Sequence, residues 1–176
     1  MTMTKTVVAW TLAIMLGAGA SGAWGHSDED TPRGAPPEKL GEVNFPVSCN
    51  AAAQKEFNRA MALFHSFWFD PAKKSFSKVL QHDPGCGMAH WGIAIMSMGN
   101  PFAWPPSQNA LKAGAAAMAE AQRVGAKSER ERDYIGALRA FFKDWETAEH
   151  RPRVVALEKA MEGVAERYPQ DIEAQI

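Results

Sequence analysis

Residues 53–84 carry the strongest structural signal in this sequence and read AQKEFNRAMALFHSFWFDPAKKSFSKVLQHDP. Apolar side chains recur in both halves at intervals of about three to four residues, the period of an amphipathic α-helix. Between the halves, Asp70-Pro71 predicts a helix start in which Asp70 is the N-cap and the proline is the first helical residue. Asp83-Pro84 predicts the end of that helix. The stretch therefore predicts two adjacent helices, over residues 50–67 and from residue 71 to Asp83.

The spacing of small and aromatic residues narrows this prediction. A frame of about 34 residues that begins at Ala53 matches the pattern of a tetratricopeptide repeat. Its small, aromatic and proline positions hold Ala60, Ala72, Phe76, Val79 and Pro84. Small residues allow two helices to approach closely, and the aromatic side chain fills the groove of the next helix. The match is partial, because Glu56 stands where tryptophan is usual and Val79 stands where alanine is usual.

The rest of the chain after residue 46 is also predicted to be helical, since Val, Ile and Thr are too sparse for strands. We expect helices over residues 88–98, 107–124, from 128 and over 152–167, with another that begins at Asp171. The first of these is apolar nearly all round, so it should be the most buried. Ser128 and Glu131 form a predicted capping box. The fold class is all-α, an α-solenoid of antiparallel helix hairpins, which we expect to be the N-terminal portion of a longer array.

The N-terminal residues predict an exported protein. Lys5 precedes an apolar run from Val7 to Leu16, and small residues follow before an acidic stretch. This order is typical of a secretory signal peptide, here residues 1–25, with a cut before His26. A membrane anchor is the alternative, but the apolar run is short for a span. We expect a flexible leader over residues 26–46, a helical domain over residues 47–176, and a periplasmic or secreted location.

The chain has two cysteines, Cys49 and Cys86. In an oxidising compartment two cysteines tend to pair, so we expect a disulfide. Free or metal-binding thiols are the alternative.

Several motifs carry a family resemblance. They are FNRAMALFHSFWF at 57–69, DPGCGMAHWGIAIMS at 83–97, NPFAWPP at 100–106 and GAKSERERDYI at 125–135. Together they resemble exported bacterial tetratricopeptide-repeat proteins of unknown function, over most of the chain after the signal peptide. The resemblance implies a repeat scaffold that continues with further helix pairs, and it carries over no catalytic residue.

The predicted function is binding of a protein or peptide partner through the concave face, without catalysis and without a cofactor. The first predicted helix would present Asn58, Met61 and His65 on that face. Phe102 and Trp104, in the proline-rich segment, either fold back onto the solenoid or line a ligand groove. Nucleic acid is excluded as a partner, because 19 basic and 20 acidic residues give a net charge of −1 and no basic patch stands out.

The sequence contains features of two other functions. Cys86, Met88 and His90, with the later methionines, offer soft ligands for copper or a site for a small ligand. Their spacing scatters them around the helix, and methionine in a buried helix is usually core. Ser66 beside His65 suggests a nucleophile, but a helical serine without a glycine-rich turn lacks the geometry that the chemistry needs. The chain is therefore not expected to be an enzyme.

Overall fold

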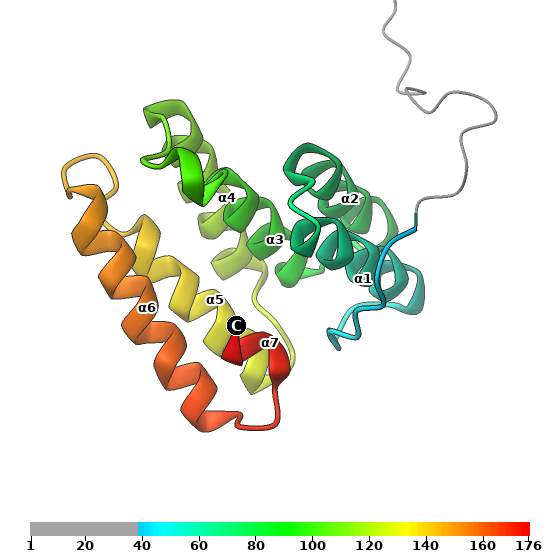
Figure 1. Ribbon diagram of the computed structural model, residues 1–176. Coiled ribbons are helices and arrows are strands. Elements are labelled where there is room, and N and C mark those ends of the chain that lie inside the picture. The colour runs from blue at the N-terminus through cyan, green and yellow to red at the C-terminus, as the bar shows by residue number, and fades with distance from the viewer. Residues whose placement is uncertain (1–38) are drawn as a thin grey trace, which may run out of the picture. The chain divides into compact units, whose positions relative to one another are not determined.

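The computed structural model describes residues 39–176. The predicted signal peptide, residues 1–25, and the leader up to residue 38 lie outside the described residues. Over residues 39–176 the chain forms seven α-helices and one short 3₁₀ turn, with no strand, which confirms the all-α class (Figure 1). The elements are α1 (Ala51–His65), α2 (Phe69–His82), α3 (Gly87–Ser97), η1 (Pro101–Ala103), α4 (Gln108–Val124), α5 (Glu129–Phe142), α6 (His150–Arg167) and α7 (Ile172–Gln175). None of these helices has the length and apolar character needed to cross a membrane.

Neighbouring helices pack in pairs. The three pairs are α1 with α2, α3 with α4, and α5 with α6, and they follow one another in Figure 1 from the green helices to the orange one. Contacts between α2 and α3, and between α4 and α5, join each pair to the next. Helix α3 also contacts α5, so the first helices of the second and third pairs lie together. The short α7 packs on α6.

Small residues are buried where helices approach closely. The frame positions Ala53, Ala60, Ala72, Phe76 and Val79 are all completely buried. A side-chain carbon placed on Gly92 of α3 would lie only 2.2 Å from Cδ1 of Phe76. A side-chain carbon placed on Gly114 of α4 would likewise lie 2.2 Å from the ring of Phe142 in α5. The packing of an aromatic ring against a glycine thus occurs at both the α2–α3 and the α4–α5 contacts.

Most predicted helix boundaries agree with the structure. Ser107 caps α4 by accepting a hydrogen bond from the amide of Ala110, and Gly125 ends that helix with φ at 74°. The capping box of Ser128 and Glu131 is confirmed. Helix α3 is predominantly buried, as predicted: eight of its 11 residues are buried.

The predicted N-cap at Asp70 is wrong. Helix α2 begins at Phe69, and the backbone carbonyl of Trp68 already accepts the amide of Ala72 at 2.9 Å. The cause is Phe67, whose φ of 60° reverses the chain within one residue and starts the helix early. Asp70 instead lies in the first turn, where its charge favours the positive end of the helix dipole.

Cys49 and Cys86 form a disulfide with Cα atoms 5.4 Å apart, as predicted. Cys49 lies just before α1, and Cys86 is the residue before α3. The bond therefore joins the starts of the first helices of two successive pairs. With a sequence separation of 37, closing the loop contributes about 3–4 kcal/mol in the chain-entropy description.

Residues before the predicted domain boundary at residue 47 also pack on the helices. Phe45 is completely buried, although the expected leader extends to residue 46. Its ring packs on Phe57, Trp91 and Tyr134, with centroids 5.4, 6.0 and 5.2 Å away. The Phe45 side chain thus anchors this part of the expected leader in the core.

Candidate functional site: an aromatic cavity on the inner helices

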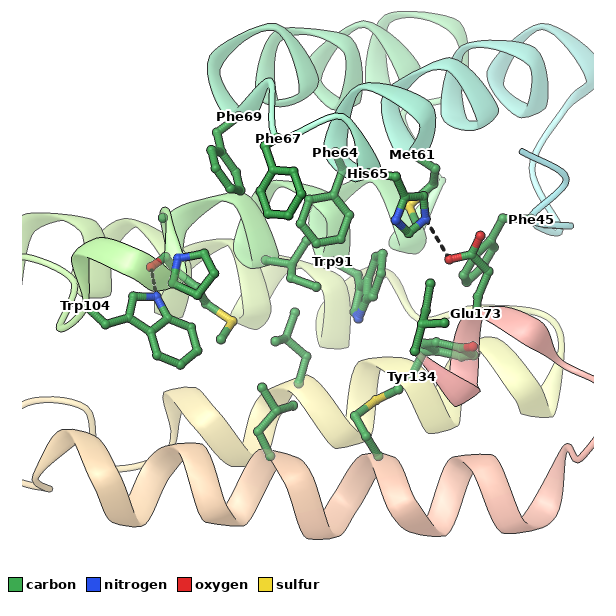
Figure 2. Close-up of a pocket in the computed structure, with 18 residues that line it drawn as sticks. Phe45, Met61, Phe64, His65, Phe67, Phe69, Trp91, Trp104, Tyr134 and Glu173 are labelled. Atoms are coloured by element: carbon green, nitrogen blue, oxygen red, sulfur yellow. Dashed lines mark hydrogen bonds and ion pairs between the residues drawn. The ribbon is translucent and has the colours of Figure 1, made fainter. Parts of the chain in front are cut away.

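A cavity of about 620 Å³ lies among α1, α3, α5, α6 and α7 (Figure 2). Its volume falls within the range of about 300–1,000 Å³ that is common for ligand sites. The aromatic residues that line it are Phe45, Phe64, Phe67, Phe69, Trp91, Trp104 and Tyr134. Leucine, isoleucine and methionine side chains supply most of the remainder. The site is therefore an apolar recess rather than a polar cleft.

Helical spacing explains how these residues come together. The inner helices contribute Met61, Phe64 and His65 from α1, Trp91 and Ile95 from α3 with Met98 just after it, and Tyr134 and Leu138 from α5. Leu157 and Met161 come from α6. Residues three, four or seven apart lie on one face of a helix, so each helix turns a single stripe toward the cavity.

The lining holds one hydrogen-bonded pair of polar side chains. Apart from Tyr134, the ionisable side chains of the lining are those of His65 and Glu173. These two side chains share a hydrogen bond. Nε2 of His65 and Oε2 of Glu173 are 2.9 Å apart, and Figure 2 draws this contact at one side of the cavity. The pair links α1 to α7. Each of these two side chains is thus already engaged by the other.

Among the buried side-chain nitrogen and oxygen atoms of the lining, the indole Nε1 of Trp91 is the one without a hydrogen-bond partner within residues 39–176. The side chain of Trp91 is 4% exposed. The other indole in the lining, Trp104, donates to the carbonyl of Met98 at 2.8 Å. A buried tryptophan N–H usually finds an acceptor, and leaving it unpaired costs about 1–3 kcal/mol.

Exposed aromatic residues continue the apolar lining outside the cavity. Phe67 is 60% exposed and lines the cavity, while Phe102 is 87% exposed and lies beyond it, with ring centroids 6.4 Å apart. Phe67 is also the residue with φ at 60°, a conformation that bulky side chains rarely adopt. Backbone strain of this kind often accompanies a binding role. We call Phe67 and Phe102 the rim pair.

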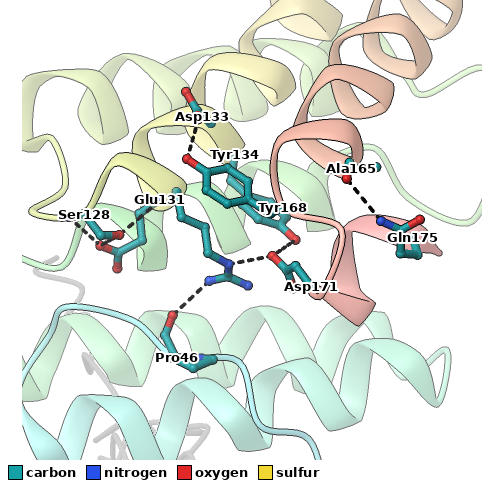
Figure 3. A network of polar contacts seen from close by, with 10 residues as sticks. Pro46, Ser128, Glu131, Asp133, Tyr134, Ala165, Tyr168, Asp171 and Gln175 are labelled. Atoms are coloured by element: carbon teal, nitrogen blue, oxygen red, sulfur yellow. Dashed lines mark hydrogen bonds and ion pairs between the residues drawn. The ribbon is translucent and has the colours of Figure 1, made fainter.

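A partly buried ion pair holds α7 beside the cavity (Figure 3). Asp171 accepts hydrogen bonds from Nε of Arg130 at 2.5 Å and from the hydroxyl of Tyr134 at 2.8 Å. Arg130 also donates a hydrogen bond to the carbonyl of Pro46, and this bond holds the segment before α1 against α5. Burial opposes ionisation of Asp171, but the hydrogen bonds from Arg130 and Tyr134 outweigh it and hold the pKa of this carboxyl below its usual value. Burial and the contact with Asp171 raise the pKa of Tyr134.

Glu131 performs a second anchoring role. Its buried carboxylate accepts hydrogen bonds from the amide and the hydroxyl of Ser48 and from the hydroxyl of Ser128. Burial raises the pKa of Glu131, but these hydrogen bonds outweigh that effect and leave the pKa below the usual value. The carboxylate that caps α5 therefore also fixes the segment that carries Phe45.

The structure brings together three of the five predicted partner-binding residues. Met61, His65 and Trp104 line the cavity, whereas Asn58 and Phe102 do not. The side-chain oxygen of Asn58 instead accepts hydrogen bonds from the amide of Phe45 and from Gln54.

The segment after α3 combines the two behaviours that the sequence left open. Trp104 folds back, with its ring 6.3 Å from Phe141 and 4.9 Å from His150, and it also lines the cavity. Phe102 projects into solvent from the short 3₁₀ turn. There the side-chain oxygen of Asn100 accepts a hydrogen bond from the amide of Phe102.

The alternative ligand set of Cys86, Met88 and His90 does not form a thiolate metal site. Cys86 is bonded to Cys49, so it has no thiol, and Met88 is completely buried in the core. His90 is partly exposed beside Glu120, and burial lowers its pKa. No group of three or more His, Cys, Asp or Glu residues suited to a metal occurs within residues 39–176.

Sequence reasoning missed Phe45, Trp91 and Tyr134. Trp91 and Tyr134 each precede another lining residue by four positions, Ile95 and Leu138, so a helical face was visible in the sequence. The convergence of those faces on one cavity is a tertiary property.

Comparison with protein-family models, with curated proteins and with solved structures found no match. The tetratricopeptide resemblance accordingly remains a prediction from the motifs.

Proposed function

We propose that this protein is an exported helical-repeat scaffold of tetratricopeptide type that binds a segment of a polypeptide partner in the aromatic cavity. It acts without catalysis and in a periplasmic or secreted location. Paired helices, buried small residues at the frame positions and the Cys49–Cys86 disulfide support this proposal. Disulfides are typical of proteins outside the cytosol.

The observation that carries the proposal is the continuity of the cavity with the rim pair. A molecule confined to the cavity would leave Phe102 in water, since that ring lies beyond the lining. A polypeptide can fill the cavity and continue across Phe67 and Phe102. Exposed aromatic residues beside a recess are typical of protein interaction surfaces, where they contribute large contact areas.

The position of the cavity also favours a polypeptide. It is built mainly from α1, α3 and α5, the first helices of the successive pairs. In helical-repeat proteins the first helices line the inner surface that extended partners occupy. His65 of α1 and Trp91 of α3 thus contribute to a surface that spans more than one pair.

A small apolar ligand is the second candidate, favoured by the cavity volume of about 620 Å³. The two candidates differ in how they use the rim pair. A small ligand held in the cavity would be retained in native mass spectrometry and would not depend on Phe102.

The test is selection from a phage-displayed library of random peptides against the full chain, exported so that its disulfide forms. The test variant is Phe67→Asn with Phe102→Ser, because asparagine tolerates positive φ. The control is Val155→Ser, another exposed apolar residue, 52% exposed on α6. We expect enriched peptides rich in apolar residues that bind the control normally and the test variant at least tenfold more weakly. Absence of enrichment, or equal binding to both, would show that the proposal is wrong.

A further inference from the structure

Within the described part of the chain, the lining of the cavity contains one buried donor without an acceptor, the indole N–H of Trp91. Trp91 packs edge to face against Tyr134, with centroids 5.8 Å apart, and its indole lies among the side chains that line the cavity in Figure 2. Nε1 has no partner among the described residues, while the hydroxyl of Tyr134 is already bonded to Asp171. An occupant that supplies an acceptor at Trp91 would remove the cost of a buried, unpaired donor.

The lining also restricts the charge of the occupant. His65 and Glu173 are bonded to each other, and the remaining lining is apolar or aromatic apart from the backbone. A lysine or glutamate side chain that entered would lose its hydration, and Glu173, the one carboxylate side chain among the lining residues, is already bonded to His65. Burying an unpaired charge costs far more than burying a hydrogen-bonded polar group.

We propose that the segment bound in the cavity is uncharged and apolar, and that one of its carbonyl oxygens accepts a hydrogen bond from the indole N–H of Trp91. This inference rests on the proposed function. Every peptide bond carries a carbonyl acceptor, so an apolar segment meets the requirement at Trp91 without a polar side chain. A single donor in an apolar recess fixes the position of the bound segment. The shielded site strengthens the bond because water does not compete for it.

The direct test uses two synthetic peptides, acetyl-Leu-Phe-Leu-Phe-amide and acetyl-Leu-Lys-Leu-Glu-amide. The chain has six tryptophans, so the indole signals in a ¹H–¹⁵N spectrum are few enough to assign, with Trp91→Phe identifying its own signal. We expect the neutral peptide to move the Trp91 indole proton downfield, as a new hydrogen bond requires. The charged peptide should bind at least tenfold more weakly.

A pair of variants provides the second measurement. Trp91→Phe should weaken binding of the neutral peptide about 3- to 10-fold, the effect of one hydrogen bond. Trp145→Phe, a partly buried tryptophan outside the lining, should leave binding unchanged. If Trp91→Phe fails to fold, the Trp91 signal of the unaltered chain decides the question.

The outcomes separate this inference from the proposed function. If selected or neutral peptides bind and shift the NMR signal of Phe67 but leave the indole signal of Trp91 unchanged, the inference is wrong and polypeptide binding stands. Equal binding of the charged peptide also overturns it. If neither the neutral peptide nor any selected peptide binds, both proposals are wrong.

Discussion

The imidazole of His65 and the carboxylate of Glu173 lie 2.9 Å apart, although 108 residues separate them in the chain. The contact joins the end of the first helix to the last helix beside the aromatic cavity. Helix α7 has four residues, too few to be stable by itself. It therefore depends on this contact and on the bonds of Asp171 to Arg130 and Tyr134.

Replacing Glu173 with alanine should loosen α7 with little effect on the rest of the protein. Because the side chain of His65 is 32% exposed, solvent weakens its contact with Glu173, and we expect a loss of less than about 1 kcal/mol in unfolding free energy. Hydrogen exchange should become faster in α7 and unchanged in α3. Glu166→Ala, an exposed acid on α6, is the matched control. Unchanged exchange in α7 would show that the pair does not hold it.

The sequence was sufficient to predict the helices because their signals are local. Ser107, Ser128 and Gly125 act within a turn of the helix that they begin or end, and the buried faces follow a period of about 3.6 residues. The boundary at Asp70 failed because the left-handed conformation of Phe67 overrides local capping preference. Nothing in the identity of a phenylalanine signals that conformation.

The site was less predictable because it depends on contacts between distant segments. Met61 and His65 were recognised from their helix face, and Trp104 from its unusual segment. Phe45 was missed because one apolar residue in a leader gives no periodic signal. The unpaired state of the Trp91 indole depends on the acceptors around it, which the sequence of α3 does not reveal.

Gly92 and Gly136 should respond in opposite directions to substitution by alanine. A Cβ on Gly92 would lie 2.2 Å from the ring of Phe76, which is itself completely buried. Gly92→Ala should therefore cost about 1–3 kcal/mol through overpacking. Gly136, within α5, has nothing within 4 Å of the added carbon, so Gly136→Ala should stabilise the helix by up to about 1 kcal/mol. Chemical denaturation measures both, and a tolerated Gly92→Ala would contradict the packing described for α2 and α3.

The disulfide should account for a large part of the stability. Replacing Cys49 and Cys86 together with serine should lower the unfolding free energy by about 3–4 kcal/mol, the effect expected for a loop of this length. A reductant should destabilise the unaltered chain by a similar amount and leave the double variant unchanged. Equal stability of the oxidised chain and the variant would argue against a stabilising role.

The stability of the protein should decrease in acid partly because of Glu131. Its pKa is lower in the folded chain than the usual value of 4.5, so its contribution is fully present above about pH 4.5 and is lost as the pH falls through the folded value. Glu131→Gln should cost about 1.5–3 kcal/mol at pH 7, because it removes charged acceptors from Ser48 and Ser128. Denaturation curves measured from pH 7 to pH 3 should show a flatter acid limb in the variant. Parallel pH profiles would show that Glu131 does not titrate in this way.

Arg153 should be a site where removing a charge stabilises the fold. Its side chain is 5% exposed, and Nη1 has no hydrogen-bond partner among the described residues. Burial lowers the pKa of Arg153, which reflects the unfavourable environment of its cation. The remaining contacts are a long hydrogen bond of 3.4 Å from Nε to the carbonyl of Glu149 and the face of the Phe141 ring at 4.8 Å.

Methionine at position 153 retains the length of the side chain and its packing on Phe141 while removing the buried charge. Replacing a buried charge with a well-packed apolar side chain is often stabilising, so Arg153→Met should raise the unfolding free energy by about 1–2 kcal/mol. Arg151→Met, at an exposed position of the same helix, should change it by less than about 0.5 kcal/mol. Thermal and denaturant unfolding of the three chains measure the effect. A loss of stability in Arg153→Met alone would mean that the guanidinium contacts with Phe141 and Glu149 outweigh the cost of burying the charge.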